Sequence, residues 1–400
     1  MKRLSALLLL LSVLLCACTS GGGLSESEVQ PESESIPHSV EISKADEVRA
    51  VWISIYELPD TAKGEGDFTA ECETMFKNIS DSGLNTAFVH VRAFADAVYP
   101  SKIFPWSKYS CHGVSPEFDP LAIMVRSAHA NGVKLHAWIN PFRVSLSNDF
   151  DSLPSDSPAK KLMGTTAVCE LSNGIYFNPA STSAHALIYD GVREILDGYE
   201  VDGIHIDDYF YPSRQESIDR TEYQQYVSDG GTKGLNEWRR DSVSAFAAGL
   251  FSLVKSYGNE KIFSISPAGN IDGNENLLFA DVELWLGEYG YADYIVPQIY
   301  FGFNNEAMPF ADITKRWAKM SNGINIVWGL AAYKCGKIDE NARSGSEEWQ
   351  KSSDILARQL DCVRTLDNYG GFALFSYSYI YEQENNENLK KEMQNLKSMI

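Results

Sequence analysis

The chain has 400 residues and a formal net charge of −20 at pH 7, because 54 Asp and Glu outnumber 34 Lys and Arg. An acidic protein gains nothing from contact with phosphate backbones, which argues against nucleic acid as a partner. The seven cysteines show no CxxC spacing, and beyond Cys16 and Cys18 they are odd in number and far apart. The sequence therefore supports neither a disulfide framework nor a cysteine zinc site.

Residues 1–17 have the pattern of an export signal. Lys2 and Arg3 precede an apolar run that is too short for a comfortable membrane span. The run closes on Leu-Cys-Ala-Cys, which resembles a bacterial lipobox, so the sequence predicts a lipoprotein signal peptide and lipidation of Cys18. The mature protein would then be exported and lipid-anchored to the outer face of the bacterial cell membrane. The alternative is an ordinary secretory signal with two incidental cysteines.

Residues 18–47 contain little that could be buried. They are rich in Gly, Ser, Glu and Pro, a composition that does not form a packed core. We expect a disordered tether that holds the next domain away from a membrane surface.

From residue 48 to residue 400, short β-type runs alternate with amphipathic helical stretches. The expected strands are 49–56, 85–92, 134–143, 203–207, 261–267, 293–300, 324–333 and 371–379. Helical patterns are expected at 68–82, 120–131, 183–198, 235–257, 310–320, 347–368 and 388–399, with a long polar loop after the third strand and an irregular segment after the fifth. Eight such units predict an α/β fold, a single (β/α)8 TIM barrel. A doubly wound sheet is the alternative, but no strand leads into a GxGxxG turn.

The fourth unit, DGIHIDDYFYP at 202–212, organises the expected site. Alternation along a strand puts His205 and Asp207 on one side and Ile204 and Ile206 on the other. Asp is a poor strand former, so two consecutive carboxylates at a strand end favour a functional site. The alternative is a cap that opens the next loop.

Active sites of such barrels lie at the carboxyl ends of the strands. Alternation along the strands predicts one cup at that end, lined by polar and aromatic side chains. Any one of these side chains, taken alone, could simply fill the interior of the barrel. Such a cup fits a sugar, because aromatic rings stack on its C–H faces while amide, guanidinium and carboxylate groups bind its hydroxyls. The expected substrate-binding residues are Arg92, Trp138, Asn140, Arg143, Asn178, His205, Tyr209, Gln298, Tyr300 and Trp328.

Glycoside hydrolysis requires two carboxyl groups. We expect Asp207 to point into the barrel as the essential catalytic carboxylate, and Asp208 to bind substrate or to tune the pKa of Asp207. Because neighbouring residues point apart, the partner carboxylate should come from another strand end, where Glu57 and Asp96 are the nearest candidates. Asp96 is preferred, since its short loop could turn back over the barrel mouth.

These motifs carry a family resemblance. NTAFVHVR, HAWINPFR, DGIHIDDYFYP, ISPAGN and DYIVPQIY occur in an order that resembles the bacterial glycosyl-hydrolase-like lipoproteins of family 10, over nearly the whole chain after the tether. The resemblance implies a (β/α)8 barrel, a lipid anchor and glycosidase activity, and at least one member acts on peptidoglycan glycan strands stripped of their peptides. The matching motif residues are Arg92, Asp96, Asn140, Arg143, Asn178, Asp207, Asp208, Arg239, Ser266, Gln298 and Tyr300. The segment after the fifth strand, ISPAGNIDGNEN, departs from the aromatic and arginine of many members.

A more distant similarity links DGIHIDDY to the fourth-strand motif of family-18 chitinases, DGxDxDxE. Tyr209 stands where the acid glutamate of that motif would be. The substrate-assisted mechanism of chitinases is therefore not carried over, and Asp207 is the carboxylate that remains.

Two other classes of function stay open. His90, His136 and His205 lie on neighbouring strands near Asp207 and could form the metal site of a sugar deacetylase. A hydrogen-bonding histidine layer is favoured instead, because no HxH or HExxH spacing supports a metal, and no cofactor is expected. The second class is a non-catalytic lipoprotein that binds cell-wall glycan. In every case the expected partners are a cell-wall glycan and, through Cys18, a membrane.

Overall fold

The structure is a computed structural model that describes residues 47–383 and 385–400. The expected signal peptide, Cys18 and the tether up to residue 46 lie outside the described residues. Glu47, assigned above to the tether, belongs to the folded domain, because its side chain is 4 % exposed and its carboxylate accepts from Arg364 Nη2 at 2.8 Å. Within the part of the chain that is described, no helix has both the length and the apolar character needed to cross a bilayer.

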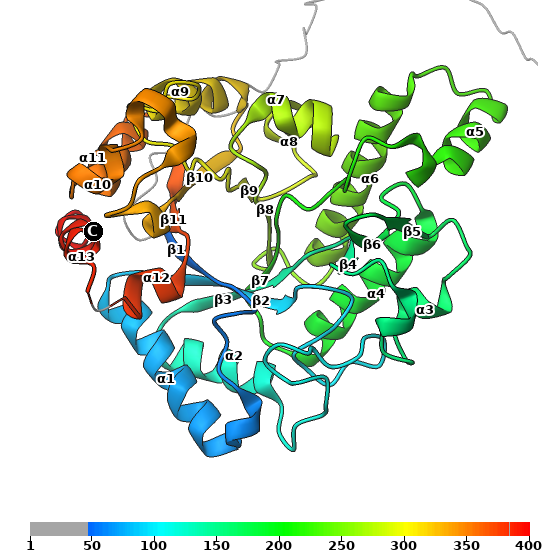
Figure 1. The fold of residues 1–400 in the computed structure, drawn as a ribbon, viewed down its shortest axis with the longest axis horizontal. Coiled ribbons are helices and arrows are strands. Elements are labelled where there is room, and N and C mark those ends of the chain that lie inside the picture. Colours follow the sequence, from blue (N-terminus) through cyan, green and yellow to red (C-terminus); the bar gives the residue numbers. More distant parts are fainter. Residues whose placement is uncertain (1–46, 384) are drawn as a thin grey trace, which may run out of the picture. The chain divides into compact units, whose positions relative to one another are not determined.

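A closed barrel of eight parallel strands lies at the centre of the domain (Figure 1). The strands are β1 (Val48–Ile53), β2 (Thr86–Arg92), β3 (Lys134–Ile139), β7 (Gly203–Ile206), β8 (Ile262–Ile265), β9 (Tyr294–Ile295), β10 (Asn325–Leu330) and β11 (Tyr369–Leu374). They pair in the order β1-β11-β10-β9-β8-β7-β3-β2, with β2 closing on β1. The predicted TIM barrel is confirmed, and each expected strand is present.

The helices surround this barrel (Figure 1). The longer ones are α1 (Glu65–Asp81), α2 (Pro120–Ala130), α4 (Thr182–Gly198), α6 (Leu235–Lys255), α9 (Phe310–Met320), α11 (Ile355–Arg364) and α13 (Glu387–Lys397). Shorter ones are α3 (Pro158–Lys161), α5 (Arg220–Ser228), α7 (Ile271–Gly273), α8 (Val282–Gly287), α10 (Glu348–Lys351) and α12 (Tyr377–Tyr381). The helix expected at 347–368 is interrupted, because Ser352 is extended and separates α10 from α11. Side-chain caps fix other boundaries: Asp119 accepts from Ala122 N at 3.1 Å where α2 begins.

The expectation that a long loop without strands follows the third barrel strand is wrong in part. It contains a small antiparallel sheet of β4 (Arg143–Ser145), β6 (Gly174–Phe177) and β5 (Val168–Leu171), which lies beside α3 and α4 in Figure 1. These strands are three or four residues long, too short to give a periodic signal. The sheet fixes the backbone of Arg143, the first residue of β4.

The barrel has two separate apolar layers. Alternate strand residues point inward and form a cluster of Ala50, Trp52, Phe88, Trp138, Tyr294, Val296, Val327 and Ala373. The other face of each strand packs with the helices in a much larger core that includes Trp328. The expectation that Trp328 lines the cup is therefore wrong. Because both faces of a parallel strand are buried, the apolar run of β10 carries no alternation that could reveal the inward face.

Candidate active site

A cavity of about 480 Å³ lies where the barrel strands end. Its lining comes from residues in or just after β1, β2, β3, β4, β7, β9 and β11. These residues are Trp52, Ser54, Tyr56, Glu57, His90, Trp138, Asn140, Arg143, Asp207, Asp208, Tyr209, Gln298, Tyr300, Phe375, Ser376, Ser378, Tyr379 and Glu382. We call this space the barrel cavity.

The structure brings most of the predicted site residues into the barrel cavity. Those in its lining are Trp138, Asn140, Arg143, Asp207, Asp208, Tyr209, Gln298 and Tyr300. Five predicted residues do not line it, namely Arg92, Asp96, Asn178, His205 and Trp328. Trp328 packs between the barrel and the helices, as described above, and the contacts of the other four residues follow below.

Asp207 and Asp208 follow directly on β7, which ends at Ile206. Asp207 is 3 % exposed, and burial, together with the negative charge of Asp208, raises its pKa well above the usual range of a carboxyl group. The pKa of Asp208 is also raised by burial, while its contact with Gln298 works in the opposite direction. Burial therefore opposes ionisation of both adjacent carboxyl groups, and the charge of Asp208 adds to this effect at Asp207.

Arg143 places a positive charge beside this pair. Its guanidinium lies 4.0 Å from the ring centroid of Tyr209 and 4.7 Å from that of Phe94, contacts that hold the cation between two aromatic rings. The charge lowers the pKa values of Asp207 and Asp208 and so opposes, in part, the effect of burial. Tyr209 is 43 % exposed, which leaves much of its side chain open to a ligand.

Several buried polar atoms in the cavity wall lack a partner. Both ring nitrogens of His90, Oδ1 of Asn140 and Nε of Arg143 have no partner with hydrogen-bond geometry among the described residues, although the Asn140 side chain lies close enough to His90 to raise its pKa slightly against the effect of burial. The His90 ring stacks on Trp138 with centroids 3.7 Å apart, and burial lowers its pKa well below the usual value, so the imidazole is neutral. Unsatisfied buried groups are rare in folded proteins. These atoms therefore mark positions where a polar ligand can supply the missing hydrogen bonds.

A histidine layer lies beneath the cavity. Nε2 of His205 accepts from Trp52 Nε1 at 3.1 Å, and its Nδ1 lies 2.8 Å from Ser264 Oγ, so both ring nitrogens are occupied. Burial lowers the pKa of His136 to about 4 and that of His205 well below the usual value. Over residues 47–383 and 385–400, no three His, Cys, Asp or Glu side chains are arranged to hold a metal ion. The contacts of His205 with Trp52 and Ser264 are those of a hydrogen-bonding layer.

Asp96 and Asn178 lie in the surrounding loops, and Arg92 is the last residue of β2. The carboxylate of Asp96 accepts from Phe94 N at 3.1 Å, and Arg92 lies over the ring of Phe104 with 4.9 Å to its centroid. Asn178 Nδ2 donates to Thr166 O at 2.9 Å. The expectation that the Asp96 loop carries this carboxylate into the cavity is wrong, because Asp96 turns back to cap its own loop.

Glu57, the alternative to Asp96, is in the lining of the barrel cavity. Its Oε1 accepts from Ser376 Oγ at 2.6 Å, from Ser378 N at 2.8 Å and from Ser378 Oγ at 2.6 Å, and Oε2 accepts from Ser54 N at 2.6 Å. The two serines belong to the string FSYSY that follows the last strand. In the sequence, serines that alternate with aromatic residues directly after a barrel strand could have predicted that this segment lines the cavity beside Glu57.

Residues 47–346 match the family described as glycosyl hydrolase-like 10. Glycosyl hydrolase YngK of Bacillus subtilis (strain 168) is 31 % identical over 357 residues, which cover 82 % of this chain and 69 % of the relative. Glycosyl hydrolase DigH of Escherichia coli (strain K12) is 28 % identical over 418 residues, covering 94 % of this chain and 93 % of the relative. The catalytic domain of β-amylase from Paenibacillus polymyxa superposes with a TM-score of 0.56 at 10 % identity, over 88 % of this chain and 99 % of that one. The last similarity shows a shared fold alone.

Proposed function

Because this chain belongs to the glycosyl hydrolase-like 10 family, we propose that it is a glycoside hydrolase that acts on a cell-surface polysaccharide, specifically on peptidoglycan glycan strands. The observation that carries the proposal is the composition of the barrel cavity. A buried carboxyl pair with raised pKa values lies there beside unpartnered polar atoms and exposed aromatic rings. These are the groups that glycosidic bond cleavage and sugar binding require.

In the proposed mechanism Asp207 is the general acid. Its raised pKa keeps a proton on the carboxyl group near neutral pH, and this proton passes to the glycosidic oxygen as the bond to the anomeric carbon breaks. Water adds its hydroxyl to the anomeric carbon, and its remaining proton passes to the ionised Asp207, which restores the acid for the next cycle. Asp208 supplies negative charge near the developing positive charge and holds up the pKa of Asp207.

We propose Glu57 as the second working carboxylate. It lines the same cavity as Asp207 but comes from the turn that follows β1, whereas Asp207 follows β7. Four hydrogen bonds fix its position, so its negative charge needs no reorganisation when the transition state forms. Asp96 lacks such a position.

The choice of peptidoglycan rests on the family resemblance of the motifs and on the export expected from residues 1–17. The cavity supports a sugar with amide groups, since the neutral His90 and the Oδ1 of Asn140 offer both donor and acceptor positions. We also propose that the chain is anchored through a lipid on Cys18. Incorporation of labelled fatty acid that is lost in a Cys18→Ser variant would support the anchor, and equal labelling of the two would contradict it.

The test of the function uses the soluble domain, starting at residue 45, with purified glycan strands that are peptide-free or intact. Mass analysis of released sugars is expected to show cleavage of the peptide-free strands by the wild type and a loss of about 10²–10⁴-fold with Asp207→Asn. Asp190→Asn, on the exposed side of α4 and 58 % exposed, serves as the matched control and should retain full activity. Equal hydrolysis by wild type and Asp207→Asn would contradict the assignment, and binding without turnover by all three proteins would favour a non-catalytic glycan-binding protein.

A further inference from the structure

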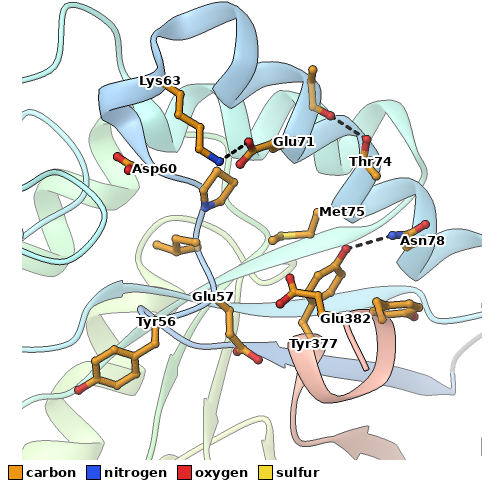
Figure 2. Close-up of a pocket in the computed structure, with 14 residues that line it drawn as sticks. Tyr56, Glu57, Asp60, Lys63, Glu71, Thr74, Met75, Asn78, Tyr377 and Glu382 are labelled. Carbon is orange, nitrogen blue, oxygen red and sulfur yellow. Dashed lines mark hydrogen bonds and ion pairs between the residues drawn. The ribbon is translucent and has the colours of Figure 1, made fainter. Parts of the chain in front are cut away.

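A second cavity of about 620 Å³ lies next to the barrel cavity, between the segment after β1, the helix α1 and the helix α12 (Figure 2). We call it the α1 cavity. Tyr56, Glu57 and Glu382 line both cavities, so the two spaces meet along a shared wall. The α1 cavity is also lined by Leu58, Pro59, Asp60, Lys63, Ala70, Glu71, Thr74, Met75, Asn78, Tyr377 and Tyr381.

The walls of the α1 cavity combine an apolar base with polar sides. Met75 and Tyr377 are 5 % and 4 % exposed and form part of the base. Asn78 Nδ2 donates to Tyr377 Oη at 3.1 Å, which fixes the amide and leaves its oxygen as an acceptor. Lys63 is paired with Glu71 at 2.7 Å. Figure 2 shows the Asn78 amide and the Thr74 hydroxyl on the α1 side and Glu57 and Glu382 on the opposite side.

Tyr56 stands on the shared wall as an exposed ring in a fixed position. It is 63 % exposed, although burial of such a ring is favourable by area. Its ring lies edge-on to Tyr109 with centroids 4.9 Å apart, and Tyr109 in turn stacks on Phe94 at 5.4 Å. A large exposed aromatic side chain that packs on Tyr109, which itself packs on Phe94, is preorganised for stacking against a ligand that passes between the cavities.

The charges of the α1 cavity restrict what it can hold. Asp60, Glu71, Glu57 and Glu382 contribute acidic groups, and Lys63 is the basic residue of the lining. A sugar that carries a carboxylate would be repelled at short range. An uncharged sugar can instead use the amide, hydroxyl and carboxylate groups as hydrogen-bond partners.

We propose that the α1 cavity is a second sugar-binding site, which holds an uncharged sugar unit of the same glycan chain that the barrel cavity cleaves, with Tyr56 as the stacking platform between them. The inference rests on the proposed function for its substrate. It adds that the protein acts on extended chains and that a unit without a carboxylate occupies the α1 side. Chains long enough to fill both cavities therefore bind more tightly than short ones.

The test fills the α1 cavity without touching the barrel cavity. Thr74 is exposed, lies on α1 and lines the α1 cavity alone, so Thr74→Trp occupies the space from a surface position. Ser80 is an exposed hydroxyl residue on the same helix that lines neither cavity, and Ser80→Trp is the matched control. Both substitutions replace exposed residues, so both proteins should fold, as circular dichroism would confirm.

Hydrolysis and binding are measured separately for each protein. For hydrolysis, kcat/KM is compared between long peptide-free strands and the shortest fragments that the wild type cleaves. Thr74→Trp should lower the value for long strands by about three- to tenfold, the range expected for a lost stacking contact, and leave short fragments unchanged. Ser80→Trp should change neither value. If the ratio of kcat/KM for long strands to kcat/KM for short fragments is the same in Thr74→Trp as in the wild type, the inference is overturned.

Binding is titrated in the Asp207→Asn background with a disaccharide and a hexasaccharide of β-1,4-linked N-acetylglucosamine. The hexasaccharide should bind more tightly than the disaccharide, and Thr74→Trp should abolish the difference. Absent hydrolysis by the wild type would contradict the proposed function, while the titration would still decide the binding site. Equal affinity for the two lengths, or a difference that survives Thr74→Trp, overturns the second site.

Discussion

Arg239 and Asp219 form a bidentate ion pair that is closed off from solvent. Nε donates to Oδ2 at 2.7 Å and Nη2 donates to Oδ1 at 2.6 Å, and the side chains are 1 % and 0 % exposed. Tyr211 Oη donates to the same Oδ2 at 2.8 Å. The pair thus ties α6 to the segment that follows β7 and carries Asp207. Arg239, which matched a family motif in the sequence, supports the site from a distance.

Replacing Arg239 with Met should destabilise the fold by about 3–5 kcal/mol, because the change leaves the buried Asp219 charge without its partner. Urea unfolding of the two proteins measures the difference. Arg240→Met is the control, since the ion pair of Arg240 with the 57 % exposed Glu275 is long, at 4.0 Å, and it should change the free energy of unfolding by less than about 1 kcal/mol. A small effect of Arg239→Met would mean that the ion pair does not hold the segment.

The fold could be predicted from the sequence because each barrel unit repeats a buried strand and an amphipathic helix. The inward position of Asp207 could be predicted because the polar side of GIHID alternates with isoleucine. The same alternation points Asp208 the other way, although Asp208 also lines the barrel cavity. Trp328 could not, since the apolar run of β10 looks the same on both faces. The sequence favoured Asp96 over Glu57, whereas Glu57 is the one that lines the cavity. Loop conformation, set by contacts such as those of Ser376 and Ser378 with Glu57, is not encoded in a local period.

Trp138 and Trp328 should respond differently to replacement, because they lie in different layers. Trp328 is 0 % exposed and packs against the helices, so Trp328→Ala should cost about 3–5 kcal/mol of unfolding free energy and leave kcat/KM of the folded protein unchanged. Trp138 lines the barrel cavity, so Trp138→Ala should lower kcat/KM on glycan strands. Thermal unfolding and hydrolysis, measured below the transition of each variant, separate the two effects. Loss of activity in folded Trp328→Ala would contradict this layering.

Glu57 and Asp96 offer a direct test of the second carboxylate. Glu57→Gln keeps the shape and removes the charge from the barrel cavity, and kcat should fall by about 10²–10⁴-fold. Asp96→Asn changes a carboxylate that lies outside the cavity and should leave kcat within a small factor of wild type. The comparison is made with peptide-free strands at saturating concentration. A larger loss with Asp96→Asn than with Glu57→Gln would return the role to Asp96.

Glu392 makes stability depend on pH. Its side chain is fully buried, it accepts from Ile355 N and Leu356 N at 2.7 and 3.0 Å, and burial raises its pKa from 4.5 to about 7. Because the folded state binds this proton more tightly, the stabilisation is complete below pH 4.5 and is lost as pH rises to about 7. The total loss is about 3 kcal/mol. Glu392→Gln should flatten this part of the profile of unfolding free energy against pH, whereas exposed Asp361→Asn on α11 should leave it unchanged.

Asp208 should set the alkaline limit of activity through its charge. If Asp207 is the general acid, kcat/KM falls when pH rises above its raised pKa, because the group that protonates the leaving oxygen is then ionised. Burial is the larger cause of that raised pKa and the charge of Asp208 is the second. Asp208→Asn removes the charge but not the burial, so the alkaline limb of the pH profile should move to lower pH while some upward shift remains. The measurement is kcat/KM against pH for wild type and Asp208→Asn on the same glycan strands. A limb that stays in place would show that the two carboxyl groups do not share their titration, and a limb that moves to higher pH would place the essential proton on a group other than Asp207.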